Sequence, residues 1–335
     1  MQNFNEKYNW TPFVAETLFT QDQDGLDCAT AVVKASFKFS SKGELHAIER
    51  EFAAPILSQD IYYDQADNSS IRYPSDRVYA KQGTDIIVNG HAYGHGRKQF
   101  TASVQCANVN KQIRVSGHRV WSKQLMGYAP SSPQAVEKIP VNYEHAYGGS
   151  PVVEGDELSF YEANPVGRGF EKVYRQQALP NLEYPKALLR GSKDRPPPCA
   201  LGVVSSNWSQ RRVYAGSFDE HWKQSRAPLL PEDFQLRFFN VVAQDQIVSA
   251  GLRGGEQIIL THLHPHQAIL KLTLPVLSIQ ASFYVKQHII NQKLELDTVL
   301  LEPDAQLLQL TYRKSLLLDE DLLYLKSVHY KMTAA

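Results

Sequence analysis

Three histidines form the string in this sequence that most resembles a metal site. In the segment HLHPH, His262, His264 and His266 would share one face of an extended strand, where imidazoles can chelate a metal ion. Pro265 interrupts a regular strand there, and no acidic residue lies nearby to orient the rings. We therefore expect structural or surface histidines and no metal site, and metal analysis of untagged protein would test this.

Four acidic residues lie in a region rich in aromatic and loop-forming residues: Glu144, Glu162, Glu183 and Asp219. Two carboxylates about 5 to 9 Å apart are sufficient for glycoside hydrolysis. A carboxylate on the surface is, however, the ordinary state of Asp and Glu. A carbohydrate-active hydrolase that uses a pair of these carboxylates is therefore the alternative function, and the sequence does not give the distances that would decide it.

Other catalytic signatures are missing from the sequence. There is no GxSxG, HExxH or GxxxxGK[ST] motif, and VGRGF (166–170) lacks the third glycine and the flanking strand of a dinucleotide-binding GxGxxG. We therefore predict that the protein is not an enzyme and that it uses no cofactor and no metal.

Alternation of apolar and polar residues with a period of two dominates the chain. In ATAVVKASFKF, Val33 and Phe37 face one side and Lys34 and Ser36 the other, which is the pattern of a half-buried strand. The SSKG turn that follows predicts a hairpin over residues 29–50. FTASVQCA and SIQASFYV predict further strands, and LELDTVLLEPDAQLLQLTY predicts two strands joined at its EPD turn.

The connections between these strands are too short and too rich in turn residues for the helical crossovers of a parallel sheet. The predicted fold is mainly β: a large antiparallel β-sandwich or barrel-like body with long ordered loops and few short helices. Ser217 and Glu220 have capping-box spacing, so we expect one helix in SFDEHWKQ, ended by Pro228. One or two helical turns are the expectation after Asp319, with a further strand pair as the alternative.

The middle of the chain, residues 148–210, is dense in Gly, Pro and Asn and predicts long ordered loops. These loops carry side chains that need burial: Phe160, Tyr161, Phe170, Leu182, Tyr184 and Trp208. We expect one domain over residues 1–335, with a two-lobed division near 140–150 left open.

Charge is balanced in total, with 35 Lys and Arg against 35 Asp and Glu, which argues against a general nucleic-acid binder. The balance conceals a split, because residues 1–167 carry 15 basic and 19 acidic residues whereas residues 168–335 carry 20 and 16. The basic excess is concentrated in 168–226, which we expect to face an acidic partner surface.

Three well-separated cysteines, Cys28, Cys106 and Cys199, indicate reduced core thiols and no disulfide framework. The sequence has no apolar run long enough for a membrane helix and no visible secretory signal. A soluble protein in the bacterial cytoplasm is therefore the expectation.

Several loop motifs occur together in a characteristic order. They are VNYEHAYGG (141–149), NPVGRGF (164–170), LPNLEYP (179–185), WSQRR with AGSFDEHWKQSRAPLLPEDFQLRFFN (208–240), GGE (254–256) and LDTVLLEPD (296–304). In this order they resemble a bacterial domain-of-unknown-function family that is often encoded beside PAAR-like or pentapeptide-repeat proteins in type VI secretion clusters. The resemblance covers about residues 30–315.

The resemblance implies an adaptor or chaperone that binds the N-terminal or PAAR-like region of a type VI effector and helps to load it onto the spike protein. It implies no catalytic residues. Together with the basic region, it indicates partner-binding or fold-determining roles for Gly148, Gly149, Asn164, Pro165, Gly167, Arg168, Gly169, Asn181, Arg190, Lys193, Arg195, Trp208, Arg212, Phe238, Phe239 and Asn240.

Overall fold

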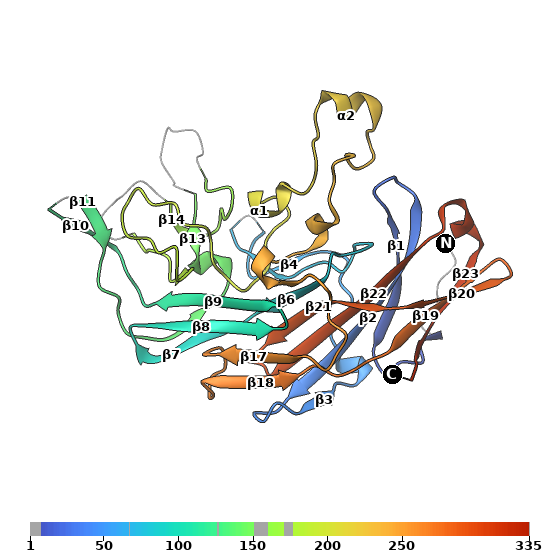
Figure 1. Ribbon diagram of the computed structural model, residues 1–335, viewed down its shortest axis with the longest axis horizontal. Helices are drawn as coiled ribbons and strands as arrows, with labels where there is room; N and C mark the ends of the chain where they lie inside the picture. The colour runs from blue at the N-terminus through green and yellow to red at the C-terminus, as the bar shows by residue number, and fades with distance from the viewer. Residues whose placement is uncertain (1–7, 67, 126, 151–159, 171–176, 335) are drawn as a thin grey trace.

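A seven-stranded sheet forms the centre of the protein in the computed structural model, which describes residues 8–66, 68–125, 127–150, 160–170 and 177–334 (Figure 1). Its strand order is β1-β2-β22-β21-β6-β16, and β3 pairs with the far end of β2. The strands are β1 (Val14–Gln21), β2 (Asp27–Phe39), β3 (Leu45–Ala47), β6 (Thr84–Val88), β16 (Ile247–Val248), β21 (Glu295–Glu302) and β22 (Leu307–Leu317).

Two further sheets pack against this one. The larger has the order β15-β9-β8-β17-β18, and the smaller has the order β20-β19-β23. Their strands are β8 (Gln99–Cys106), β9 (Val109–Ser116), β15 (Leu182–Glu183), β17 (Gln257–Thr261), β18 (Ile269–Thr273), β19 (Ile279–Val285), β20 (His288–Lys293) and β23 (Leu325–Met332).

The remaining elements are strand pairs and short helices in the connecting segments. The strands are β4 (Ile61–Tyr62), β5 (Ile71–Tyr73), β7 (His91–Arg97), β10 (Trp121–Gln124), β11 (Gly127–Pro130), β12 (Val136–Pro140), β13 (Tyr147–Gly148) and β14 (Arg168–Gly169). The helices are α1 (Ser209–Arg212), α2 (Glu220–Ser225) and the 3-10 turns η2 (Arg50–Phe52), η3 (Tyr143–His145), η4 (Leu236–Phe239), η5 (Gln244–Gln246) and η6 (Asp319–Tyr324).

One main hydrophobic core joins the three sheets and draws on residues from Phe13 to Tyr330. The apolar positions of the alternating segments face it, as expected: Val33 and Phe37 of β2 are buried in this core, and so is Phe283 of β19. The predicted mainly β fold is therefore confirmed, including the antiparallel pairing of β2 with β3 and of β21 with β22. All three cysteines are buried and free, as predicted.

The expectation that β2 is half-buried was wrong. Its polar face is also covered, because the segment that carries β4 and β5 crosses it, and Lys34 is only 5% exposed. Lys34 Nζ lies 2.5 Å from a carboxylate oxygen of Asp76 and donates to the carbonyl of Pro55. Alternation in the sequence reported the polarity of this face correctly, but it could not reveal a loop that brings a carboxylate to neutralise the lysine.

The pairings of the central sheet are antiparallel except that β21 pairs with β6 in parallel. The expected cap of the helix in SFDEHWKQ needs correction. Helix α2 is capped by Asp219, whose carboxylate accepts from the Trp222 amide at 2.8 Å, whereas Ser217 bonds to Asp233. Asp219 lies one residue before the helix and is therefore better placed as an N-cap.

Burial in the middle loops is uneven. Trp208 and Leu182 are buried as predicted, but Phe160 is 45% exposed. Parts of this region, 151–159 and 171–176, lie outside the described residues. In the part of the chain that the structure describes, no helix is long and apolar enough to cross a membrane.

Candidate functional site

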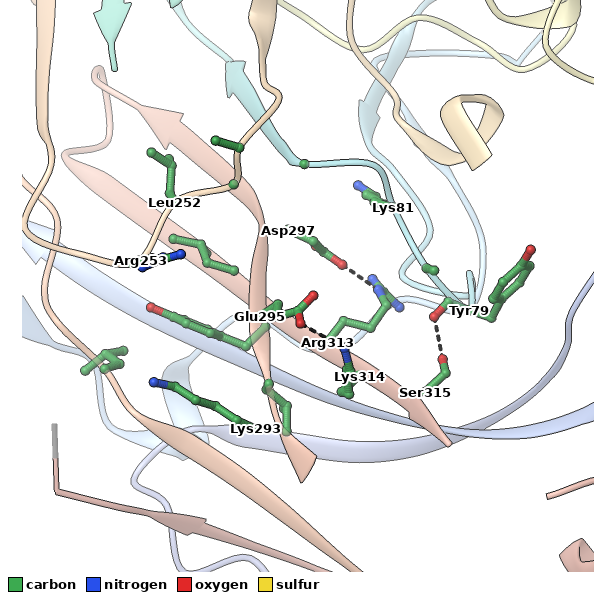
Figure 2. A pocket seen from close by; sticks show the side chains of 18 of the residues that line it. Tyr79, Lys81, Leu252, Arg253, Lys293, Glu295, Asp297, Arg313, Lys314 and Ser315 are labelled. Atoms are coloured by element: carbon green, nitrogen blue, oxygen red, sulfur yellow. Dashed lines mark hydrogen bonds and ion pairs between the residues drawn. The ribbon is translucent and has the colours of Figure 1, made fainter. Parts of the chain in front are cut away.

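A groove of about 920 Å³ opens where β21 enters the central sheet (Figure 2). The register between β21 and β22 shifts between Leu296 and Thr298, which leaves Asp297 as a bulge. Strand β6 pairs with β21 only from Thr298 onward, and before that point a single bridge joins Leu296 to Leu252. The sheet is therefore incomplete beside the first residues of β21, and the groove occupies this gap.

The floor of the groove is made of buried charges that neutralise each other. Arg313 Nε donates to the Asp297 carboxylate at 2.6 Å, and the arginine side chain is 3% exposed. Its Nη1 donates to the carbonyls of Asp76 and Val78. These bonds hold the chain that leads into β6, so Arg313 is a structural residue whose Nε and Nη1 donors are both engaged.

Lys81 is a second buried cation in the floor. Its ammonium group lies 2.9 Å from Asp85 and 2.8 Å from the Thr298 hydroxyl, and its side chain is 3% exposed. Both cations of the floor thus have a carboxylate partner, as burial of a charge requires.

The rim of the groove differs from the floor, because its cations are exposed. Lys314 pairs with Glu295 at 2.8 Å, and both side chains reach solvent. Arg253 and Lys293 are also exposed, and neither has an ion-pair partner among the residues that the structure describes. The lining as a whole contains five cationic and three acidic side chains, which are Lys81, Arg253, Lys293, Arg313 and Lys314 against Asp22, Glu295 and Asp297.

Apolar side chains also reach the rim. Val276 and Leu317 line the groove and are 58% and 51% exposed. The Tyr312 hydroxyl is buried and has no hydrogen-bond partner among the described residues, and burial raises the pKa of Tyr312. The groove therefore combines apolar contact surface with an excess of positive charge.

The GGE motif explains why Arg253 stands at the rim. The Glu256 carboxylate accepts from the amides of Arg253 and Gly254 at 2.9 and 2.8 Å. A Cβ atom on Gly254 would lie 2.5 Å from the carbonyl oxygen of Pro275, and Gly254 has a φ of +95°. Only glycine fits this turn, and the turn presents Arg253 to the groove.

The NPVGRGF and VNYEHAYGG motifs meet around Asn164, which is fully buried. Asn164 Nδ2 donates to the carbonyls of Tyr143 and Tyr147 at 2.9 and 3.0 Å. A Cβ atom on Gly148 would lie 2.1 Å from the Asn164 carbonyl oxygen, and one on Gly167 would lie 2.4 Å from Asn164 Nδ2. Packing therefore requires Asn164 and these glycines together.

Arg168 and Asn181 tie the same loops to the sheet behind them. Arg168 Nε donates to the carbonyl of Glu144 at 2.7 Å, and its guanidinium lies 3.5 Å from Asn181 Oδ1. Asn181 Nδ2 donates to the carbonyl of Ser116, the last residue of β9. Burial lowers the pKa of Arg168. These contacts make Arg168 a clamp on loop carbonyls.

His145 lies in the same group. Its Nδ1 is 3.0 Å from Asn181 Oδ1, and burial together with the charge of Arg168 lowers the pKa of His145 to about 4. We refer to residues 143–149, 164–169 and 181 as the Asn164 cluster. It contains Gly149, Pro165 and Gly169 as well as the residues above.

Trp208 and Arg212 flank this cluster. The Trp208 ring is buried and lies edge-on to Tyr143, with ring centroids 5.1 Å apart. Arg212 forms an ion pair with Glu162, and both side chains are more than half exposed. Trp208 is thus a core residue, whereas Arg212 is available at the surface.

Phe238, Phe239 and Asn240 connect the long middle segment to β6. The two phenylalanine rings pack against Phe234, with centroids 5.7 and 5.3 Å away. Asn240 is fully buried and donates to the Asp85 carboxylate at 2.8 Å. Asn240 is thus an interior residue, and Phe238 and Phe239 are half-buried.

The basic loop residues Arg190, Lys193 and Arg195 are all exposed. Asp194 lies among them and accepts from the amides of Arg190 and Gly191, and these two bonds lower the pKa of Asp194. This loop is a separate surface feature whose residues are absent from the lining of the groove.

The four carboxylates of the hydrolase alternative serve other roles in the structure. Glu144 accepts from Ser70, Glu162 pairs with Arg212, Glu183 pairs with Arg119, and Asp219 caps α2. The Glu183–Arg119 pair is buried, with the carboxylate 2.6 Å from the guanidinium. None of these contacts joins two of the four carboxylates.

The three histidines of HLHPH have divergent environments. His262 Nδ1 lies 2.9 Å from the carbonyl of Thr101, and His264 Nδ1 accepts from the His266 amide. His264 is buried, and burial together with the charge of His266 lowers its pKa. Within the described ranges, no group of three His, Cys, Asp or Glu side chains is arranged to hold a metal ion.

Several of the motif residues singled out in the sequence thus lie together in the Asn164 cluster, whereas the cations of the groove rim were not among them. Arg253 is next to a recognised motif, while Lys293 and Lys314 lie in ordinary strand segments that carry no motif. They meet because β6 pairs with β21 only from Thr298 onward, and a linear pattern has no signal for that gap in the sheet.

The structure defines a mainly β protein with an open groove at an interrupted sheet. The chain belongs to the family described as "Uncharacterized protein conserved in bacteria (DUF2169)", which matches residues 24–313. Comparison with curated proteins and with solved structures gives no match.

Proposed function

We propose that this protein is a non-enzymatic cytoplasmic adaptor or chaperone. In this proposal it binds the N-terminal or PAAR-like region of a type VI secretion effector, stabilises the effector and promotes its loading onto the secretion spike. The order of the loop motifs described above supports the proposal.

The groove is the observation that carries the binding role. Its buried cations, Arg313 and Lys81, are already neutralised by Asp297 and Asp85, whereas its exposed rim offers apolar side chains and surplus positive charge. A catalytic site needs a nucleophile, acid or base that is free to act on a substrate. A surface that mixes apolar contacts with accessible charge is suited to a protein segment.

The test is co-expression of this protein with the effector encoded beside it. We expect the two proteins to copurify, and we expect deletion of the adaptor to lower both the amount of soluble effector and its secretion. Restoring the adaptor gene in trans is the control. Unchanged effector solubility and secretion in the deletion strain would refute the proposal.

A further inference from the structure

Strand β20 is the open edge of the small sheet. It pairs with β19 on one side, and no strand occupies its other side in the part of the chain that the structure describes. The Leu294 amide donates to the carbonyl of Ile279 at 2.9 Å, so these two residues form a hydrogen-bonded pair of the antiparallel ladder. Since bonded and non-bonded pairs alternate, the backbone groups of Ile289, Asn291 and Lys293 point away from β19.

This edge has few of the features that normally prevent pairing. Its sequence, HIINQK, contains no proline, and its register with β19 has no shift. Its one charged residue, Lys293, stands at the end of the strand. Native edges are usually blunted by proline, charge, a bulge or a covering loop, so β20 is built to accept another strand.

The face of the sheet beside this edge is apolar and aromatic around Ile289 and polar around Asn291, whose side chain bonds to Gln280 and Ser282. Ile289 is 55% exposed and lies opposite Tyr284 in the register. The Tyr284 and Tyr8 rings each pack on the imidazole of His329, with ring centroids 4.2 Å from it. A strand added to β20 would place alternate side chains beside Ile289, where aromatic neighbours increase the buried contact area.

Charge indicates what kind of strand would fit. Lys293 ends β20 and also lines the groove, so the open edge leads directly into the groove. There Lys293 and Arg253 are exposed and have no ion-pair partner among the described residues. A second copy of β20 would bring no carboxylate to them, because HIINQK contains none. An acidic segment from another protein would neutralise them.

We propose that the partner protein supplies an extended segment that adds to β20 as a strand and places acidic side chains at Lys293 and Arg253. The inference rests on the proposed function, because it names the face on which the adaptor binds its partner. Main-chain hydrogen bonds to Ile289, Asn291 and Lys293 provide affinity in this mode, and side-chain pockets provide specificity.

The backbone part of the proposal is tested by Asn291→Pro, with Asn291→Ala as the matched control. Both variants lose the side-chain bonds of Asn291 to Gln280 and Ser282. Only proline also removes the outward amide, and it leaves the bonded pairs with β19 intact. We expect Asn291→Pro to bind the neighbouring effector at least tenfold more weakly than Asn291→Ala. Equal affinities would overturn strand addition.

The charge part is tested by the double variant Arg253→Glu with Lys293→Glu. The matched control, Arg253→Lys with Lys293→Arg, keeps both charges. We expect the reversal to weaken effector binding at least tenfold at low salt, with a smaller effect at high salt. This test remains informative even where the proline variant fails to fold, because Arg253 and Lys293 are exposed and their substitution should not disturb folding. A charge reversal without effect on affinity would overturn the proposal that the added segment is acidic.

Defined peptides separate failure of this inference from failure of the adaptor proposal. The probes are an extended Val/Thr peptide with Asp and Glu at one end and the same peptide with Lys in their place. We expect the acidic peptide alone to slow amide hydrogen exchange at Ile289, Asn291 and Lys293 in the full-length protein. Absence of this protection, or a homodimer that already protects these amides, would overturn the inference whether or not the effector binds.

Discussion

The Asn164 cluster and the groove use polar side chains in opposite ways. In the cluster, Asn164 and Arg168 donate to backbone carbonyls of neighbouring loops, and glycines stand where a Cβ would collide with backbone atoms. At the rim of the groove, Arg253 and Lys293 extend to solvent without an ion-pair partner among the described residues. The polar side chains of the cluster bond to groups of the cluster itself, whereas the rim leaves positive charge available to a partner.

This difference distinguishes residues that the fold requires from residues that are available to bind a partner. The motif residues of the cluster are required by bond geometry and space inside the protein, so their regular order reports how the loops fold. The rim residues make few internal contacts, and their removal leaves little unsatisfied. Substitutions that lower the stability of the fold are therefore expected in the cluster and in the groove floor, and substitutions that lower binding alone are expected at the rim.

The largest expected effect is that of Gly148→Ala in the cluster. The new Cβ would lie 2.1 Å from the Asn164 carbonyl oxygen at a backbone φ of +153°. Strain and overpacking together should lower the free energy of unfolding by about 2–5 kcal/mol. Gly191→Ala is the control, because a Cβ there meets no atom within 4 Å. Similar denaturation midpoints for the two variants would show that the cluster is not tightly packed.

The groove floor should resemble the cluster rather than the rim. Asp297→Ala leaves Arg313 buried without its carboxylate, which is expected to cost about 3 kcal/mol of unfolding free energy. Glu295→Gln, at the exposed Lys314 pair, should cost less than about 1 kcal/mol. Urea unfolding of both variants measures the contrast. Equal losses would mean that floor and rim do not differ.

Acid should weaken the cluster through His145. Its pKa of about 4 in the folded protein is below the unfolded value of about 6.5, so it contributes almost nothing to the pH dependence above about pH 7.5. Below that pH the unfolded chain binds a proton that the folded protein does not. The free energy of unfolding should therefore fall by about 2 kcal/mol between pH 7.5 and pH 5.0.

The variant His145→Gln isolates this contribution. Burial also lowers the pKa of His264 and His329, so the wild-type protein contains other acid-sensitive groups. The variant should lose about 2 kcal/mol less than the wild type between pH 7.5 and pH 5.0. An identical loss in both proteins would place the acid sensitivity outside the cluster.

Features set by residues close together in the sequence are predictable from it, whereas contacts between distant segments are not. Period-two alternation predicts β2, β19, β21 and β22, because the residue types of a strand alone determine which of its faces is apolar. The cover over Lys34 depends on Asp76, which lies 42 positions away, and alternation could not predict it. Asn164 and Gly148 belong to two separate loop motifs, and no sequence pattern indicates that they contact each other. Lys293 had no local signal at all.

The smallest expected effect concerns the basic loop of Arg190, Lys193 and Arg195. These exposed side chains surround Asp194, whose carboxylate is held by backbone amides and offsets part of their charge. Reversing all three to Glu should slow association with an acidic partner severalfold at low salt, with little change in dissociation, because rim charges act mainly on encounter. Reversal of Arg253 and Lys293 should instead speed dissociation. Stopped-flow association at two salt concentrations distinguishes the two, and faster dissociation of the loop variant would place the partner on the loop rather than in the groove.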